Sequence, residues 1–379
     1  MNLSTRQRRV LNFFFLINFT LIAISQIVLY CLISPLKLVS YSCFIKLDKI
    51  FIGLFARIIG PWLTLLVYKV KVDPKNYRLG PDPNEIIDLA SPSVKILIVC
   101  NHQTVMDAVI MYFGCLDNKF VKFVLVWSKY YRFRINGLIH KIRNDFGIDS
   151  SFKKGDFVEY WELTSRNYNT VLLCPEGAFR NVYLESSFRY AEKNGLPQLT
   201  RTVWPRTRAF LDIVDKRNGF TYIIDTTIIY DNIDKLTRNL FLHTEQLMGS
   251  SFYSVIRVFE IIDDDKSETI NDYDQIVNDF NKIQSLETVE QSDCVYRVPR
   301  SKLNESWLQQ LWLSKDSMMN SFYQDKDNFV GKFKPNCYNQ INLFHIMDFL
   351  LANSVYIPMG STIIYLVYLS IAAIFKLFI

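Results

Sequence analysis

The sequence predicts an α/β domain with a mainly parallel β-sheet flanked by helices, held between hydrophobic segments at both ends of the chain. Short, nearly continuous apolar runs recur at KILIVC (95–100), KFVLVW (122–127), TVLLC (170–174) and TYIIDTTIIY (221–230). Longer amphipathic stretches separate these runs. Strands that are buried on both faces and joined by helices produce this alternation. We expect the domain to span residues 75–262.

Residues 1–74 are predicted to anchor the chain in a membrane. No charged residue lies between positions 10 and 36, and this stretch exceeds the roughly 20 residues that cross a bilayer core. It is too long for a signal peptide's apolar region and ends without a small-residue cleavage site. Residues 50–70 are also apolar but include Arg57 and Pro61, so we expect a helix in the interface or re-entering the membrane.

Two further segments complete the predicted organisation. Residues 263–348 are a C-terminal extension that begins with the acidic stretch DDDKSETINDYDQ, a solvated linker or the start of a surface helix. Within it, residues 307–324 place apolar side chains at helical spacing, which favours a helix packed on the core over one on the membrane surface. Residues 349–379 open with another uncharged run and are predicted to form a C-terminal transmembrane helix.

Charge and cysteine usage limit the function classes. The net charge of +6 arises from 43 basic and 37 acidic residues spread along the chain, which is no nucleic-acid footprint. It fits contact with an anionic leaflet or an ordinary solvated surface. The seven cysteines show no C-x-x-C spacing, which favours reduced thiols in a cytosol-facing domain over a zinc site. We expect no nucleic-acid partner and no metal.

The first candidate for chemistry is NHQTVMD (101–107), which follows an apolar run. Helical residues five apart are rotated by about 140°, so His102 and Asp107 can meet only if His102 lies on the turn before the helix. A carboxylate that holds a His in one tautomer and makes it more basic suits a general base. In the alternative, Thr104 and Asp107 form a capping box, and Asn101 and His102 are turn residues.

The second candidate is the turn PEGAFR (175–180), which follows the run TVLLC. Ligands bind beyond the carboxyl ends of parallel strands, so this turn should open beside NHQTVMD. There, Glu176 would accept a hydrogen bond from a hydroxyl and Arg180 would pair with a phosphate. The alternative is a solvated turn.

Together the two motifs resemble those of the glycerolipid acyltransferases, the acyl-CoA-dependent lysophospholipid acyltransferases, which carry N-H-x4-D and a downstream P-E-G-T-R-like motif. The resemblance implies a fold like that of glycerol-3-phosphate acyltransferases. It also implies that His102 is the base and Asp107 orients it. Substrate binding would fall to Asn101, Glu176, Gly177 and Arg180.

Three more segments are similar to the branch that includes lysocardiolipin and lysophosphatidylinositol acyltransferases. They are VWPRTRAF (203–210), DTTIIYDN (225–232) and LWLSKDSMMNSFYQDKDNF (311–329). The PRTR cluster offers Pro205 as a rigid turn and Arg206 and Arg208 as phosphate partners. A basic loop on a membrane surface is the alternative for this cluster.

The sequence departs from the family pattern in two places. Ala178 and Phe179 intervene after Gly177, so Arg180 comes one place late and its side chain is rotated by about 100° on a helical turn. The family's second motif corresponds to residues 135–151, where its Arg falls at Ser150. That phosphate contact is missing or is supplied by Arg143, Lys153 or Lys154. Three histidines outside any motif are interpreted as structural: His140, His243 and His345.

The resemblance implies that His102 deprotonates a lysophospholipid hydroxyl, which attacks the thioester of acyl-CoA without a covalent acyl-enzyme or a metal. Backbone amides after His102 are candidate oxyanion donors. The expected acceptor is lysophosphatidylinositol or another anionic lysophospholipid, in phospholipid synthesis or remodelling. The expected partners are acyl-CoA, lysophospholipid and the bilayer. The expected location is the endoplasmic reticulum membrane, or a lipid-droplet or mitochondrial membrane.

Three other functions stay open at this point. One is a 1-acyl-glycerol-3-phosphate (lysophosphatidic acid) acyltransferase, which performs the same chemistry on a smaller acceptor. Another is a non-catalytic lipid-binding homologue, against which the intact His-x4-Asp pair argues. The third is a hydrolase that uses the same pair. Membrane topology is also open, because a single first crossing would place Lys37, Lys46 and Lys49 on the wrong side for the positive-inside rule.

Overall fold

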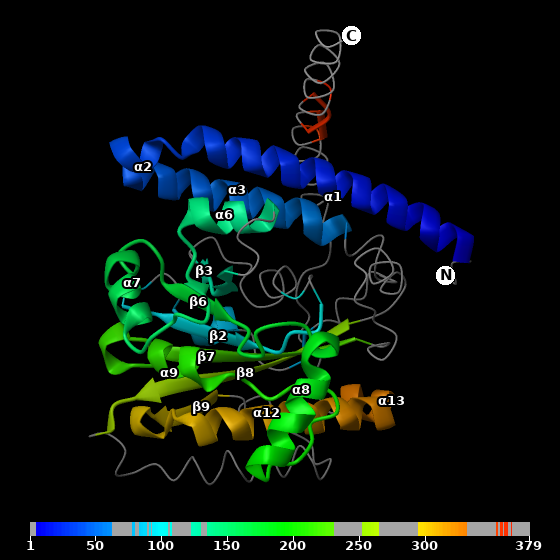
Figure 1. The fold of residues 1–379 in the computed structure, drawn as a ribbon, viewed down its shortest axis with the longest axis vertical. Helices are drawn as coiled ribbons and strands as arrows, with labels where there is room; N and C mark the ends of the chain where they lie inside the picture. The colour runs from blue at the N-terminus through cyan, green and yellow to red at the C-terminus, as the bar shows by residue number, and fades with distance from the viewer. Residues whose placement is uncertain are drawn as a thin grey trace.

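The computed structural model describes residues 5–62, 78–79, 83–88, 91, 93–104, 107, 123–129, 135–230, 252–264 and 295–331, with scattered positions between 354 and 365. Within these residues, a seven-stranded sheet is flanked by helices (Figure 1). The sheet is mixed and mostly parallel. The predicted α/β class with a mainly parallel sheet is therefore confirmed.

The sheet has the strand order β1-β8-β7-β2-β6-β3, and β9 pairs with β8. Its strands are β1 (Arg78–Leu79), β2 (Ile96–Cys100), β3 (Phe123–Leu125), β6 (Thr170–Leu173), β7 (Tyr222–Tyr230), β8 (Phe252–Ile262) and β9 (Val295–Pro299). All four predicted strands are present and run parallel to one another as β3, β6, β2 and β7. Among the described strands, antiparallel pairing joins only β7 and β8. A small ribbon pairs β4 (Trp127–Ser128) with β5 (Gly147–Ile148).

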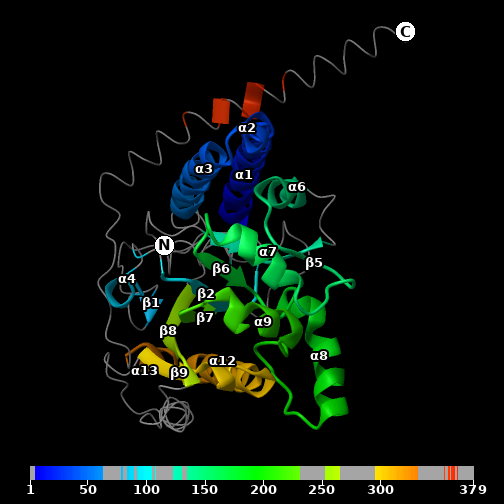
Figure 2. The same cartoon turned by 90° about the vertical axis from the view of Figure 1, so that its left-hand side faces the viewer.

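Helices cover the sheet from several sides. They are α1 (Thr5–Ile33), α2 (Leu36–Val39), α3 (Tyr41–Trp62), α4 (Pro83–Ile86), α6 (Ile135–Arg143), α7 (Asp156–Thr164), α8 (Arg180–Asn194), α9 (Thr207–Ile213), α12 (Glu305–Gln324) and α13 (Lys326–Gly331). Both views of the ribbon show α1, α3 and α6 together beyond the β3 edge, with α12 and β9 at the opposite end of the molecule (Figures 1 and 2).

The N-terminal helices cover the segment that the sequence predicts to be a membrane anchor. Among the described residues, one helical stretch, Asn12–Val39, is long and apolar enough to cross a membrane by length and composition, and 33% of its apolar window is buried. Part of the predicted second segment is helical, as the end of α3, and positions 63–70 lie outside the described residues. Also outside them lie most of the predicted C-terminal transmembrane helix (349–379), residues 265–294, His243 and His345.

A buried polar cluster fastens α1 and α3 to the domain. We call it the junction: Tyr30, Asp48, Arg143, Asp145 and Tyr168. Arg143 donates from Nε to Asp48 Oδ1 (3.0 Å) and from Nη1 to Asp145 Oδ2 (2.8 Å). The hydroxyls of Tyr30 and Tyr168 donate to the two oxygens of Asp48 at 2.7 and 3.1 Å. The Arg143 guanidinium is buried and paired in this way, so it is not available to replace the missing phosphate-binding Arg of the second motif.

Helix α12 packs on the core, as its apolar spacing favours. The Asn304 side chain caps it by accepting from the Trp307 amide at 3.0 Å. Trp307 stacks on Phe210, with ring centroids 5.7 Å apart, and lies edge-on to Phe259. The predicted extension thus contributes both this helix and strand β9 to the body of the domain.

Candidate active site

The two predicted motifs lie side by side because their strands are parallel neighbours. Val99 of β2 pairs with Leu173 of β6, so the turns that follow leave the sheet at the same edge. The backbone amide of Arg180 donates to the carbonyl of His102 at 3.0 Å, which joins the two turns. The ring of Phe179 lies edge-on to the imidazole of His102, with centroids 4.6 Å apart. The extra residues in PEGAFR therefore place an aromatic ring against His102.

His102 and Asp107 form a hydrogen-bonded pair at this edge. His102 Nδ1 lies 2.9 Å from Asp107 Oδ2; the His side chain is 24% exposed, and the Asp side chain is fully buried. The same Asp107 oxygen accepts from the backbone amides of Gln103 (2.5 Å) and Thr104 (2.8 Å). Asp107 thus closes the capping box and holds His102 at once, so the two sequence interpretations are compatible.

Tyr230 completes the surroundings of Asp107 from the neighbouring strand. Its hydroxyl, at the end of β7, donates to Asp107 Oδ1 at 2.6 Å and lies 3.1 Å from Thr104 Oγ1. Sequence reasoning assigned no role to Tyr230. The available signal was its place at the carboxyl end of a buried strand within DTTIIYDN, the same kind of position that singled out His102.

The electrostatics of the site raise the pKa of His102. Burial lowers this pKa. The negative charges of the neighbouring Cys174, Asp107 and Glu176, together with the hydrogen bond to Asp107, outweigh burial and bring the pKa to about 9. The imidazole therefore holds a proton more tightly than an ordinary His. Because Nδ1 contacts Asp107, Nε2 is the nitrogen left to exchange a proton with a ligand.

Glu176 occupies a tight turn next to His102. The Gly177 amide donates to the Cys174 carbonyl at 3.1 Å, with Pro175 at the position where β-turns favour proline. Glu176 is 1% exposed; its Oε1 accepts from Trp312 Nε1 at 3.0 Å, and its Oε2 makes no hydrogen bond of normal geometry among the described residues. Burial raises the pKa of Glu176 to about 8, against the lowering effects of Trp312 and His102. The backbone of His102 lies close enough to this carboxyl group to lower its pKa.

Arg206 packs against the outside of the same turn. Its amide donates to the Pro175 carbonyl at 2.8 Å, and its exposed guanidinium lies over the Tyr183 ring, 4.8 Å from the centroid. Gly177 has φ +77°, and a Cβ there would lie 3.3 Å from the Arg206 side chain. Both constraints favour glycine at this position. Pro205 is buried just before Arg206.

The other predicted phosphate ligands are placed differently. Arg180 donates from Nε and Nη2 to the Thr200 carbonyl at 3.1 and 2.5 Å. Arg208 donates to the carbonyl of Phe152 at 3.3 Å. Lys153 and Lys154 are exposed. Arg206 is therefore the predicted arginine with the clearest position beside Gly177.

Asn101 and Gln103 flank His102 and are buried. The Asn101 amide donates to the Ile228 carbonyl (2.9 Å) and accepts from the Ile228 amide (2.7 Å), as a backbone group of a paired strand would. These bonds occupy its side chain, so the structure favours a positioning role for Asn101 over contact with a substrate. Gln103 donates to the Arg201 carbonyl at 3.3 Å, while its Oε1 has no polar partner among the described residues.

A second His-x4-Asp pair shows that the spacing alone is not specific. His140 Nδ1 lies 2.8 Å from Asp145 Oδ2, the same contact that joins His102 to Asp107. Asp145, however, also accepts from Arg143 at 2.8 Å, so its charge is already compensated within the junction. The environment of the carboxylate, rather than the spacing, distinguishes the two pairs.

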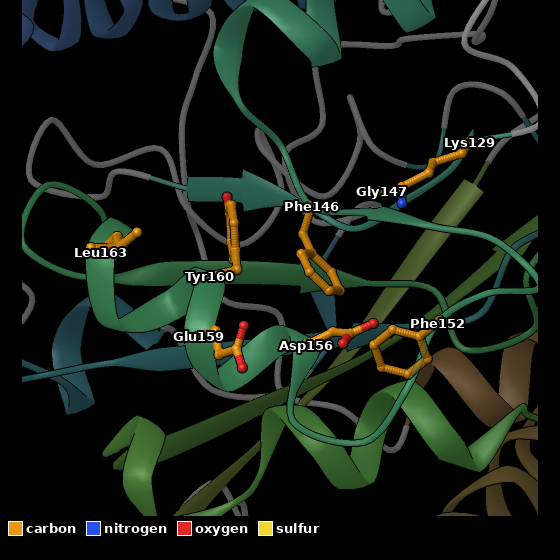
Figure 3. Close-up of a pocket in the computed structure, with 8 residues that line it drawn as sticks. All are labelled: Lys129, Phe146, Gly147, Phe152, Asp156, Glu159, Tyr160 and Leu163. Carbon is orange, nitrogen blue, oxygen red and sulfur yellow. The ribbon is translucent and has the colours of Figure 1, made fainter.

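A pocket of about 420 Å³ opens elsewhere, between the β4–β5 ribbon and α7. Figure 3 shows Phe146, Phe152 and Tyr160 along it, with Lys129 at the ribbon and Asp156 and Glu159 on α7. None of its lining residues belongs to the predicted catalytic set. Lys129 is itself paired with Asp149 at 3.3 Å.

Comparisons with known proteins point to one kind of enzyme, although no family model and no solved structure matches the chain. Human acyl-CoA:lysophosphatidylglycerol acyltransferase 1 is 25% identical over 263 residues, 60% of this chain and 67% of that protein. The Caenorhabditis elegans lysophosphatidylinositol acyltransferase 10 is 34% identical over 79 residues, 20% of each chain. The putative 1-acyl-sn-glycerol-3-phosphate acyltransferase acl-12 of the same organism is 29% identical over 127 residues, 30% of this chain and 31% of that protein. All these relatives are named acyltransferases, and their similarity supports an enzyme that transfers acyl groups, related to the lysophospholipid and glycerolipid acyltransferases.

Proposed function

We propose that the protein transfers a fatty acyl group from acyl-CoA to a free hydroxyl of an anionic lysophospholipid. The observation that carries the proposal is the His102–Asp107 pair at the carboxyl edge of the parallel strands, with both oxygens of Asp107 held by buried donors. The names of two relatives support this acceptor class, since lysophosphatidylglycerol and lysophosphatidylinositol are both anionic and rich in hydroxyls. Lysophosphatidylinositol remains our preferred acceptor.

In the proposed reaction, His102 Nε2 removes the proton from the acceptor hydroxyl while Nδ1 donates to Asp107. The new alkoxide attacks the thioester carbonyl, the carbon–sulfur bond breaks, and the thiolate of CoA leaves and takes up the proton that His102 Nε2 now carries, which returns His102 to its neutral form. Asp107 fixes the tautomer and stabilises the imidazolium that forms, which is the usual role of a carboxylate behind a catalytic His. A thioester is reactive enough for this direct attack, so the chain's residues need supply no covalent nucleophile.

The basic side of the site would bind the acceptor's phosphate. Arg206 is exposed next to Gly177, and its guanidinium can make two parallel hydrogen bonds to phosphate oxygens. Arg180 begins α8 at the same edge and is the second candidate. The apolar stretch Asn12–Val39 supports a membrane-bound enzyme, for which we propose the endoplasmic reticulum membrane.

A direct assay tests the proposal. Purified protein is incubated with acyl-CoA and one acceptor at a time: lysophosphatidylinositol, lysophosphatidylglycerol or lysophosphatidic acid. The products are identified and quantified by mass spectrometry. We expect diacyl product from the first two. Product from lysophosphatidic acid alone would indicate the smaller-acceptor enzyme, and fatty acid released without any acceptor would indicate a hydrolase. If no acceptor is acylated, the proposal is wrong.

The pH dependence of the reaction gives a second test. We expect kcat/KM for the acceptor to rise with pH up to about 9, because only neutral His102 accepts a proton and its pKa is about 9. In Asp107→Asn this rise should move to lower pH, since the hydrogen bond and charge that raise the pKa are lost. The measurement is kcat/KM between pH 6 and 10 for both proteins. A rise at the same pH in both would contradict the role of Asp107.

A further inference from the structure

One face of α12 contacts four segments of the candidate site. Its residues recur three or four positions apart, as neighbours on one helix face do. Trp312 bonds to Glu176, Met319 lies 3.8 Å from Asn101 Nδ2, and the Tyr323 hydroxyl donates to the Tyr230 carbonyl. Asp316 accepts from the amides of residues 201 and 202 at 2.6 and 2.8 Å. Helix α12 thus contacts a site whose predicted residues all come from earlier in the chain.

We propose that Trp312 is a positioning residue for acceptor binding, because its Nε1 holds Oε1 of Glu176 so that Oε2 faces the acceptor's hydroxyl groups. This inference rests on the proposed function. Trp312 acts through Glu176 and touches no reacting atom, so it is not itself catalytic.

The contact between the two side chains supports this role. Both are almost completely buried, and the bond from Trp312 Nε1 to Glu176 Oε1 is 3.0 Å long. An indole has a single N–H donor, so Trp312 can satisfy one carboxyl oxygen only. The other oxygen makes no hydrogen bond of normal geometry among the described residues. A buried polar atom in that state is costly, and a ligand hydroxyl would satisfy it.

Charges beneath the site hold Trp312 in place. The Lys315 ammonium lies over the indole, 5.1 Å from the ring centroid. Lys315 is in turn paired with Asp225 Oδ1 at 2.5 Å and donates to the Thr226 carbonyl at 2.7 Å. Arg257 donates to the other oxygen of Asp225 at 2.6 and 2.9 Å. A side chain fixed in this way can set the orientation of Glu176 within a narrow range.

The variant Trp312→Phe tests the inference, since it keeps an aromatic ring and removes only the N–H donor. We expect kcat/KM for the lysophospholipid to fall about tenfold or more, with KM for acyl-CoA unchanged. The acceptor KM of this variant should also depend on pH differently from that of the wild type. Trp312 lowers the pKa of Glu176, so its loss should move the inflection of acceptor KM upward from about pH 8.

Trp307→Phe is the matched control. Trp307 lies on the same helix and is buried to a similar degree, but it packs on Phe210 and Phe259 rather than on the site. The Trp307→Phe variant should be less stable than the wild type but have the same acceptor KM. If Trp312→Phe and Trp307→Phe have the same acceptor KM, with the same dependence of that KM on pH, the inference is overturned.

A double variant separates positioning from damage to the fold. In a Glu176→Ala background, Trp312→Phe should cost no further kcat/KM, because the group through which it acts is gone. An equal loss in both backgrounds would overturn the inference. A wild-type protein that acylates no acceptor would instead refute the proposed function, so the two failures are distinguishable.

Discussion

Replacing His102 with Ala should lower the rate of acyl transfer about 10²- to 10⁴-fold, which is the usual contribution of a general base. The residue to compare is His140, because His140→Ala removes an imidazole with the same spacing and the same contact to a carboxylate. We expect His140→Ala to keep kcat within about twofold. Both rates are measured by mass spectrometry of the product, with acyl-CoA and lysophosphatidylinositol as substrates, and are divided by the amount of folded protein.

The contrast rests on what surrounds each carboxylate. Arg143 compensates the charge of Asp145, whereas Asp107 accepts hydrogen bonds from uncharged donors, Gln103, Thr104 and Tyr230. The negative charge of Asp107 is therefore available to stabilise an imidazolium, whereas that of Asp145 is already compensated by Arg143. Full activity in His102→Ala, or equal losses in both variants, would contradict this distinction and with it the assignment of the site.

The fold and the first motif could be predicted because both depend on short-range patterns. β2, β6 and β7 are buried on both faces, so their sequences are apolar almost without interruption. β9 alternates exposed and buried side chains at the edge of the sheet, and sequence reasoning placed it in an extension. The His102–Asp107 pair could be predicted because its two residues lie only five positions apart in the sequence.

The remaining parts of the site come from distant positions. Tyr230 and Trp312 reach the motifs across 123 and 136 residues of sequence, a separation that no local pattern reports. The junction escaped prediction for a related reason. In the sequence, Asp48 lies between Lys46 and Lys49. Only the fold brings Arg143 within 3.0 Å of it.

Asp48→Asn should destabilise the protein by about 3–5 kcal/mol, the cost of removing one partner from a buried ion pair. Asp48 accepts hydrogen bonds from Arg143, Tyr30 and Tyr168, and an amide nitrogen at one of its positions would face a donor. The free energy of unfolding in detergent measures the loss. Glu260→Gln is the control, since it breaks an exposed pair with Arg297 and should leave stability nearly unchanged.

The same substitution also tests whether α1 and α3 are a passive anchor or part of the domain. The junction links Tyr30 on α1 and Asp48 on α3 to Arg143 on α6, next to the carbonyl of Phe123 in β3, which Arg143 also bonds at 2.9 Å. If the helices are part of the domain, Asp48→Asn should expose the α3–α6 contact to protease at temperatures where the wild type resists. If the variant unfolds at the wild-type free energy and resists protease equally, the junction does not hold the helices. In that case their contact with the sheet rests on apolar packing alone.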